Sequence, residues 1–255
     1  MAVSRSNRNV FWVHNDSGDQ PRVYAVSGTG RMLATYTLEG AAAVDWEDMG
    51  IGPAPDGGSY LYLADIGDNN ARRASIRIYR VAEPRVDGDQ APVTSTLGGV
   101  ADFEFVYSDG ARDAEGFFVD PLTGDFYVVT KREDNIRVYR SSAPRAGERN
   151  TFERTVTLPF TLATGADISA DGLQVLIRRY SLDPREAARA ATYWRRADAS
   201  VSLAQLLSQP GEAVALVQEV QGEAIAFAPD GRGFYTATER VSMPQAPLTF
   251  YPPEP

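Results

Sequence analysis

The sequence predicts an all-β fold, a single β-propeller whose five blades each hold about four antiparallel strands. The first reason is that the apolar runs are short, rich in β-branched and aromatic residues, and bounded by Gly, Pro, Asp and Asn. The second is that Glu115, Thr164 and Glu223 each stand 11 residues before the matching position in a second apolar run. The third is a short aromatic strand that recurs at residues 22–26, 77–81, 137–141, 192–196 and 248–252.

These repeats divide the chain into blades at residues 1–40, 41–110, 111–161, 162–220 and 221–255. We assign all of them to one domain, 1–255, because all-β folds often reach this size as a unit. The pattern is clearest over residues 113–140, where the turns DPLTGD and KREDN separate three strands. In the second blade Glu47 stands 14 residues before Leu61, so this turn is three residues longer than in the other blades.

Two blades carry additional segments. In the second, the Gly, Pro and Thr content of residues 87–99 predicts an exposed loop, and residues 101–107 alternate as a half-solvated edge strand does. In the fourth, residues 181–191 and 199–211 predict short helical insertions between strands. The fifth blade shows three strands and no obvious fourth.

Composition limits the possible partners. The net charge of −9 and the pI near 4.7 argue against nucleic acid and anionic lipid, both of which need basic surface. No apolar run is long enough to span a membrane, and the absence of Cys excludes disulfides, thiolate zinc sites and cysteine nucleophiles. We expect a monomer that takes a small molecule at its channel mouth. No leader pattern opens the sequence, which predicts a cytoplasmic protein, or a secreted or periplasmic one whose leader has been removed.

The repeat geometry predicts a ring of acids. The first strand of each propeller blade lines the channel, so Glu47, Glu115 and Glu223, with Thr164, form one ring around the axis. The ends of the second strands form another ring: Asn15-Asp16, Asp65, Thr130-Lys131, Arg179-Tyr180 and Thr238-Glu239. Carboxylates held this close need a counter-charge. Either a hard cation such as calcium supplies it, or Lys131, Arg178 and Arg179 reach inward and pair with the acids.

The candidate site residues follow from the two rings. The candidate calcium ligands are Glu47, Glu115, Glu223, Asp65, Asp16 and Asn15. The candidate catalytic residues are His14, Glu223, Glu239, Lys131 and Arg179. His14, a ring carboxylate or Glu239 would act as general base or nucleophile, and Lys131 or Arg179 would stabilise developing negative charge. The alternative for His14 is a packed strand residue. The sequence has no Gly-rich phosphate loop, HExxH or GxSxG motif.

Several segments resemble a family of poorly characterised bacterial β-propeller proteins that are common in actinobacteria. They are WVHNDSGD, DWEDMGIGP, LADIGDN, DAEGFFVD, TGADISADG and QGEAIAFAPDG, and the resemblance covers essentially the whole chain. Members usually carry a secretion leader and an acidic ring residue in the first blade, and this sequence has neither. More distantly, the acidic funnel is similar to that of calcium-dependent propeller hydrolases: gluconolactonases, senescence-marker-type lactonases, paraoxonases and the esterase-like phytase group.

The resemblance implies a channel calcium that polarises an ester, lactone or phosphotriester oxygen. A hydrolase of this type is therefore the first functional hypothesis. The alternative is a non-catalytic propeller that binds a ligand or protein, its channel stabilised by a cation or by salt bridges. A glycosidase is a weaker alternative, because some five-bladed propellers place carboxylates around a sugar.

Overall fold

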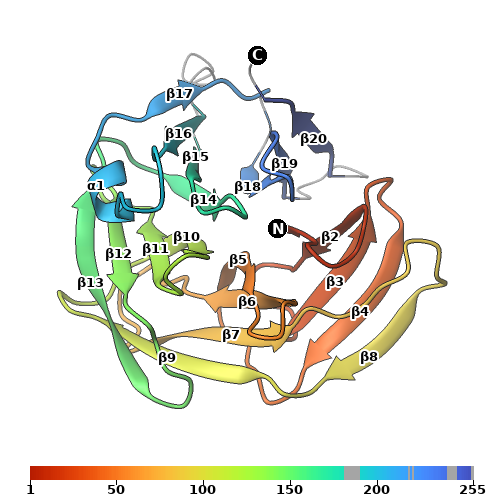
Figure 1. Cartoon of the computed structure of the whole chain (residues 1–255). Helices are drawn as coiled ribbons and strands as arrows, with labels where there is room; N and C mark the ends of the chain where they lie inside the picture. Colours follow the sequence, from red (N-terminus) through yellow and green to blue (C-terminus); the bar gives the residue numbers. More distant parts are fainter. Residues whose placement is uncertain (181–189, 218, 220, 240–245, 254–255) are drawn as a thin grey trace.

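Antiparallel sheets stand around a common axis in the computed structural model, which describes residues 1–180, 190–217, 219, 221–239 and 246–253 (Figure 1). The strand nearest the axis opens each group of strands. These innermost strands are β1 (Ala2–Val3), β5 (Trp46–Pro53), β10 (Ala114–Val119), β14 (Ala163–Ile168) and β18 (Gly222–Phe227). β5, β10, β14 and β18 pack side by side in that order, and β1 contacts both β18 and β5. The chain therefore forms a β-propeller, as the sequence predicted.

The outer strands follow in four sheets. The first has the order β1-β2-β3-β4-β8, with β2 (Val10–Val13), β3 (Arg22–Ser27), β4 (Met32–Leu38) and β8 (Val93–Leu97). The second has the order β10-β11-β12-β13-β9-β7-β6-β5, with β6 (Ser59–Asp65), β7 (Ile76–Ala82), β9 (Ala101–Tyr107), β11 (Phe126–Thr130), β12 (Arg137–Ser141) and β13 (Arg149–Thr157). The third, β14-β15-β16-β17, adds β15 (Gln174–Arg179), β16 (Ala191–Arg195) and β17 (Glu212–Val214). The fourth, β18-β19-β20, adds β19 (Phe234–Thr238) and β20 (Leu248–Tyr251).

Two predictions for the second blade were wrong. Residues 93–97, expected in an exposed loop, form β8 and pair in parallel with β4 of the preceding blade. Their side chains are mostly exposed, so the strand is held by its backbone, and no apolar alternation marked it in the sequence. β9 was expected at an edge, but β13 pairs with it in parallel and β7 covers its other side. This pairing joins two neighbouring blades into one sheet, and the count of five blades and the single domain stay predictions.

The predicted helical insertion at residues 199–211 contains α1 (Leu203–Leu207), and the insertion predicted at residues 181–191 lies almost entirely outside the described residues. Ser202 caps α1: its side chain accepts a hydrogen bond from the Gln205 amide, and the Gln205 side chain bonds back to the Ser202 backbone. No helix in the described part of the chain has the length and apolar character that crossing a membrane requires.

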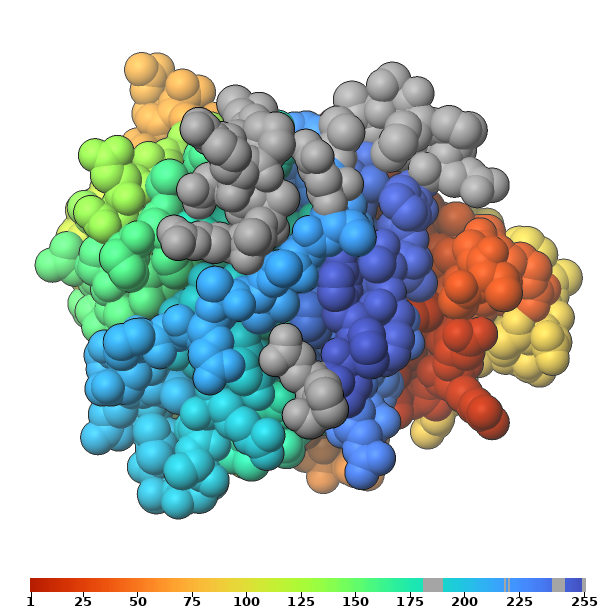
Figure 2. Space-filling view, turned by 90° about the horizontal axis from the view of Figure 1, so that it is seen from above, coloured from red at the N-terminus to blue at the C-terminus, as the bar shows by residue number. Residues whose placement is uncertain are grey.

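The first and last sheets meet and close the circle of sheets. In the space-filling view the blue strands near the C-terminus adjoin the red segment near the N-terminus (Figure 2). Phe11 of β2 packs edge-on against Tyr235 of β19, with ring centroids 4.9 Å apart. Met1, Val3, Phe11 and Ala226 form a buried apolar cluster at this junction. Apolar packing therefore joins the first and the last sheet of the described chain.

Candidate functional site

A β-bulge marks the same position in four innermost strands. The pairing of β5, β10, β14 and β18 with their neighbours skips one residue each time. The skipped residues are Glu47, Glu115, Thr164 and Glu223. A bulge adds an unpaired residue and re-aims its side chain. The ring that the sequence predicted from spacing is therefore built from four bulges, which free these side chains from the alternation of the strand.

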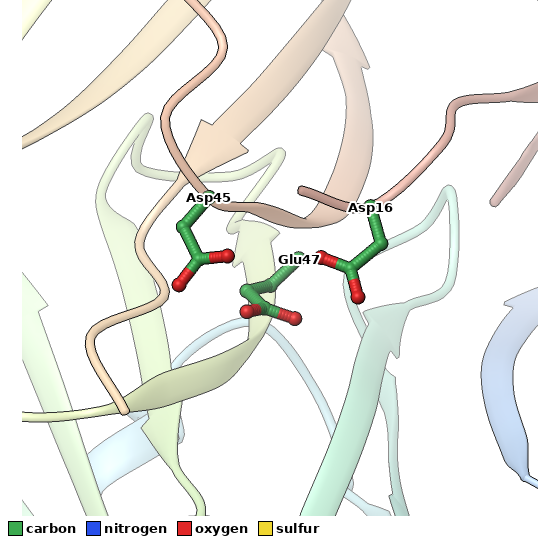
Figure 3. A group of neighbouring side chains, drawn as sticks. All are labelled: Asp16, Asp45 and Glu47. Atoms are coloured by element: carbon green, nitrogen blue, oxygen red, sulfur yellow. The ribbon is translucent and has the colours of Figure 1, made fainter. Parts of the chain in front are cut away.

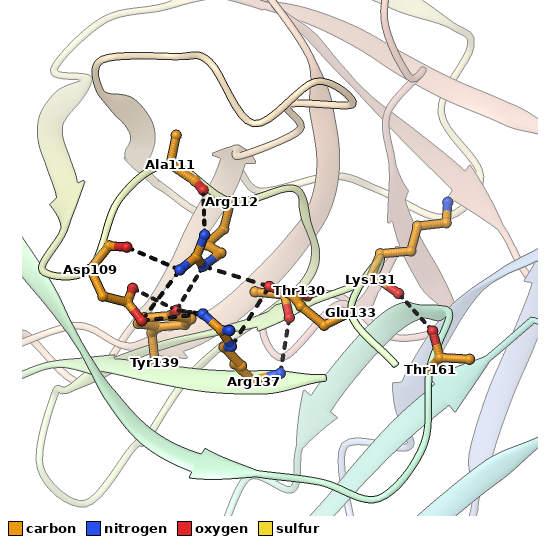
Figure 4. Close-up of polar contacts among 9 residues, drawn as sticks. All are labelled: Asp109, Ala111, Arg112, Thr130, Lys131, Glu133, Arg137, Tyr139 and Thr161. Carbon is orange, nitrogen blue, oxygen red and sulfur yellow. Dashed lines mark hydrogen bonds and ion pairs between the residues drawn. The ribbon is translucent and has the colours of Figure 1, made fainter. Parts of the chain in front are cut away.

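Lys131 is the cation at the centre of this ring. Its Nζ lies 2.7 Å from Oε1 of Glu115. Burial opposes the charged ammonium group, but the carboxylates of Glu115, Glu223 and Glu47 outweigh it and raise the pKa of Lys131. The backbone is fixed from both sides: the Lys131 amide donates to Asp113 O at 3.1 Å, and Lys131 O accepts from the Leu162 amide at 2.9 Å. Figure 4 shows the ammonium group pointing away from the neighbouring Arg112 network. The predicted counter-charge on the acidic ring is thus present at Lys131.

The positive charge of Arg178 also acts on the ring, where it lowers the pKa of Glu223. Its guanidinium pairs with Glu219 and donates to the carbonyls of Ala224 and Ala237 at 2.8 and 2.9 Å. It therefore ties the neighbouring strands β18 and β19 together from beneath the ring. Arg179, the other predicted partner, lies over the Phe160 ring at 4.8 Å.

Three carboxylates meet beside the ring. Oxygen atoms of Asp16, Asp45 and Glu47 all lie within 4.8 Å of one another (Figure 3). Asp16 follows β2, Asp45 immediately precedes β5, and Glu47 is the bulged residue of β5. No hydrogen bond from the described residues reaches the carboxylates of Asp45 and Glu47. We call these three residues the acidic cluster.

The end of β6 and the loop that follows it support the acidic cluster. Asp65 is fully buried, and its carboxylate accepts the amides of Val44 and Asp45 at 3.1 Å each. Arg73 Nη1 lies 2.7 Å from the same carboxylate. These contacts occupy both carboxylate oxygens of Asp65, which the sequence predicted to be a calcium ligand. Asp65 instead holds the backbone of Asp45, and Asp45 is the residue that joins the acidic cluster.

Gly67, in the same loop, makes room for the acidic cluster. A Cβ at this position would lie 2.2 Å from Oε1 of Glu47 and 2.5 Å from Oδ2 of Asp45. The Gly67 amide also donates to Asp45 O at 3.1 Å. With any other residue at position 67, the carboxylates of Glu47 and Asp45 would have to move. The carboxylate oxygens of Asp16, Asp45 and Glu47 come from separate segments and lie next to the space that the absent Gly67 side chain leaves open. Carboxylate oxygens are the ligands that calcium prefers.

Burial and mutual repulsion raise the pKa values in and around the cluster. For Glu47 burial contributes most, followed by the charges of Glu115, Asp16 and Asp45. Burial also raises the pKa of Glu115, and the Lys131 ammonium opposes this rise. Glu223 reaches a pKa of about 8, through burial and the charges of Glu115 and Glu239 against the opposing charge of Lys131. Glu223 is therefore mostly protonated at neutral pH.

The remaining predicted residues lie at the edge of the site. The half-buried His14 ring has Nδ1 3.0 Å from the Asn15 carbonyl, so Nδ1 is the donor and Nε2 carries the lone pair. Burial and the positive amino terminus lower the pKa of His14 to about 4. Asn15 is exposed and donates to Asp19 Oδ2 at 2.7 Å, outside the acidic cluster. Glu239 accepts a hydrogen bond from Gln221 Nε2 at 2.9 Å.

Sequence reasoning missed Asp45, Gly67 and Arg73. The only available signal was their position in the segments DWEDM and DIGDNNARR, one of which holds Glu47 and the other Asp65. Neither segment has the spacing of a known calcium loop. The grouping of Asp45 and Gly67 depends on how the loop after β6 folds back over β5, which is a tertiary contact.

We expect the calcium-free protein to lose stability as the pH rises. A carboxyl group with a raised folded-state pKa keeps a proton that the unfolded chain has released, so the free energy of unfolding falls between the two pKa values. Glu223, Asp48 and Asp167, with pKa values of about 8, 7 and 6, act in this direction, as does Glu47. With chelator present, the loss between about pH 5 and pH 8 should reach several kcal/mol.

Denaturant unfolding across this pH range measures the effect. With calcium bound, the free energy of unfolding should fall less steeply with pH. The ion would stabilise the ionised forms of Asp45 and Glu47, so only the other buried carboxyl groups would still lower the stability as the pH rises. A calcium-free stability that rises between pH 5 and pH 8 would contradict the assignment of raised pKa values.

Comparison with known proteins gives no family. No protein-family model matches the sequence, and no curated protein matches it. Among solved structures, a functionally unknown protein from Desulfotomaculum acetoxidans is 16% identical, with a TM-score of 0.37 over 96% of this chain and 67% of that one. A proposed 6-phosphogluconolactonase from Bacteroides uniformis is 12% identical, with a TM-score of 0.46 over 96% and 79%. A chain of a nidogen/laminin complex is 15% identical, with a TM-score of 0.44 over 88% and 69%. Likenesses this weak say nothing about activity.

Proposed function

We propose that the protein is a calcium-dependent hydrolase that acts on esters, lactones or phosphotriesters at the channel mouth. The observation that carries the proposal is the acidic cluster of Asp16, Asp45 and Glu47, with oxygens within 4.8 Å of one another. The positive charge of Lys131 lowers the pKa of both Glu47 and Glu223, and burial still raises the pKa of Glu223 to about 8. Cation ligands, a proton-transfer group and a positive charge are the three components that hydrolysis of such substrates requires.

Contrast with the other buried acids supports a cation at the cluster. Asp48 accepts the amides of Phe117 and Ala166 at 3.0 and 3.1 Å, and Asp120 pairs with Arg196 at 3.0 Å. These two buried acids are thus satisfied by the protein's own donors. The carboxylates of Asp45 and Glu47 receive none from the described residues, although Glu47 is half-buried. A bound cation would supply the partner that these two carboxylates lack among the described residues.

In the proposed mechanism Asp16, Asp45 and Glu47 would hold the calcium, and the ion would supply Lewis-acid chemistry to a C=O or P=O group. The Lys131 ammonium stabilises negative charge that develops on the substrate. Glu223, protonated below its pKa of about 8, donates a proton to the leaving group. His14, neutral above its pKa of about 4, accepts a proton from the attacking water at Nε2. At neutral pH Glu223 is protonated and His14 is neutral, so Glu223 can act as the acid and His14 as the base.

A hydrolase panel tests the proposal. Purified protein is assayed for calcium content, then for hydrolysis of an aryl ester, a lactone, a phosphotriester and an aryl glycoside, with and without chelator. We expect turnover of one of the first three substrates, its loss in chelator, and its recovery on adding calcium. If the calcium-saturated protein turns over none of them, the hydrolase is wrong. Turnover of the glycoside alone would favour the glycosidase.

The second candidate function is a non-catalytic binding propeller. The ion pair of Lys131 with Glu115 favours it, because this pair satisfies one ring acid without any metal. Breaking a buried pair of this kind by removing one partner typically costs about 3–5 kcal/mol, which is consistent with a structural role. The panel separates the two functions, since a binding propeller has no chelator-sensitive turnover.

A further inference from the structure

The fourth ring position holds Thr164 in place of an acid, and its hydroxyl contacts the neighbouring sheet. The Thr164 side chain on β14 is buried, and its Oγ1 donates to the Gly222 carbonyl of β18 at 3.1 Å. Gly222 is the residue before Glu223, the bulged residue of β18. The threonine therefore holds the peptide that leads into the bulge.

Arg178 on β15 holds the peptide that follows the bulge. Its Nη1 donates to the Ala224 carbonyl at 2.8 Å and to the Ala237 carbonyl of β19 at 2.9 Å. The guanidinium also pairs with Glu219, and both side chains are almost fully buried. The Glu219 carboxylate accepts from the Thr236 hydroxyl at 3.0 Å, so the pair is anchored in the sheet that carries Glu223.

Two glycines let the two sheets approach this closely. A Cβ at Gly222 would lie 1.8 Å from Nη2 of Arg178, and a Cβ at Gly165 would lie 2.5 Å from the Glu223 carbonyl oxygen. The carbonyls of residues 222, 223 and 224 therefore all meet residues of β14 or β15.

The side chain of Glu223 is not held in the way that Glu115 is. Glu115 occupies the equivalent bulge of β10, and its carboxylate pairs with Lys131. In the described part of the chain no hydrogen bond or ion pair reaches the Glu223 carboxyl. Because a bulge re-aims its side chain, the direction of this carboxyl depends on the backbone of the bulge.

We propose that Thr164 and Arg178 are positioning residues for Glu223: they fix the backbone on both sides of its bulge and so hold the carboxyl where a proton can pass to the leaving group. This inference rests on the proposed function, in which Glu223 is the acid. A proton donor acts only within hydrogen-bond reach of the atom that receives the proton. Misplacing a reacting group by about 1 Å can lower the rate about a hundredfold.

Thr164→Val keeps the shape of the side chain and removes its donor. We expect kcat to fall at least about tenfold while KM and calcium affinity stay within about twofold, because only the acid is misplaced. Thr164→Ser keeps the hydroxyl and should keep most of the wild-type rate. Thr192→Val changes a buried threonine of β16, in the same sheet, and should leave the rate unchanged.

A double variant separates positioning from a general loss of structure. In the Glu223→Gln background Thr164→Val should cause no further loss of rate, since no acid is left to position. An equal loss in both backgrounds would overturn the proposal, and so would a wild-type kcat in Thr164→Val alone.

The pKa of the Glu223 carboxyl, measured by NMR of the side-chain carbon in chelator, tests the positioning without any substrate. Burial is the main cause that raises this pKa to about 8. Thr164→Val and Gly222→Ala should each lower it by at least about 0.5, because a released bulge lets water reach the carboxyl. Gly222→Ala displaces the Arg178 guanidinium and keeps every charge, and if this variant does not fold, Thr164→Val decides. If the wild type turns over no substrate, the hydrolase is wrong, and an unchanged Glu223 pKa in the variants would then overturn the positioning as well.

Discussion

Glu47→Gln is expected to abolish tight calcium binding and, at the same time, to stabilise the calcium-free protein. The amide removes one charged ligand of three, which should weaken calcium binding at least about a hundredfold. In chelator at pH 8 the wild type must keep a proton on Glu47 that the unfolded chain releases, because burial and the neighbouring acids raise the pKa of this carboxyl. Glutamine avoids that cost, so the variant should gain a few kcal/mol.

Calorimetry with calcium and denaturant unfolding in chelator measure the two effects. Glu153 is an exposed residue of β13, an outer strand. The control variant Glu153→Gln removes the same charge there and should change neither the calcium affinity nor the stability of the calcium-free protein. The two effects have opposite signs, which a general loss of structure cannot produce. A variant that binds calcium as the wild type does would show that the acidic cluster is not the cation site.

Glu223→Gln is expected to lower the rate of hydrolysis by about 10²–10⁴ while calcium affinity changes little. Glu223 lies outside the acidic cluster, so its loss removes a proton donor and leaves the three ligands in place. The basic limb of the pH–rate profile, near the Glu223 pKa of about 8, should disappear with it. His14→Asn should instead remove the acidic limb near pH 4, the pKa of His14.

Steady-state kinetics across pH, with calcium titrations of each variant, check these expectations. Glu212→Gln, on the exposed edge strand β17, is the control for loss of one carboxylate in the last third of the chain. If Glu223→Gln retains the wild-type rate and both limbs, Glu223 is not the acid. If His14→Asn loses only stability, the alternative of a packed strand residue holds for His14.

The sequence by itself determined most of the strands and the ring positions. Regular spacing of 11 residues placed Glu115, Thr164 and Glu223 at equivalent points of their blades. Each blade must bury the same faces of its strands, so equivalent residues recur at the same position in each repeat. Strand alternation and turn residues are local, so the sequence shows them directly. The capped insertion that contains α1 is visible for the same reason. The acidic ring followed from this repeat, whereas the sequence left its counter-charge open between a cation and the side chains of Lys131, Arg178 and Arg179.

Tertiary structure decided which of these side chains meet. A bulge at each ring position leaves no mark in the sequence, since any residue type can be the extra one. Asp65 and Asp45 are both acidic residues near a strand end, and only the folded loop shows that the first holds the backbone of the second. The parallel pairing of β8 with β4 depends on backbone groups, which are the same in every residue. The site is formed by contacts between segments that are far apart in the chain. No local sequence pattern shows which of these segments will meet.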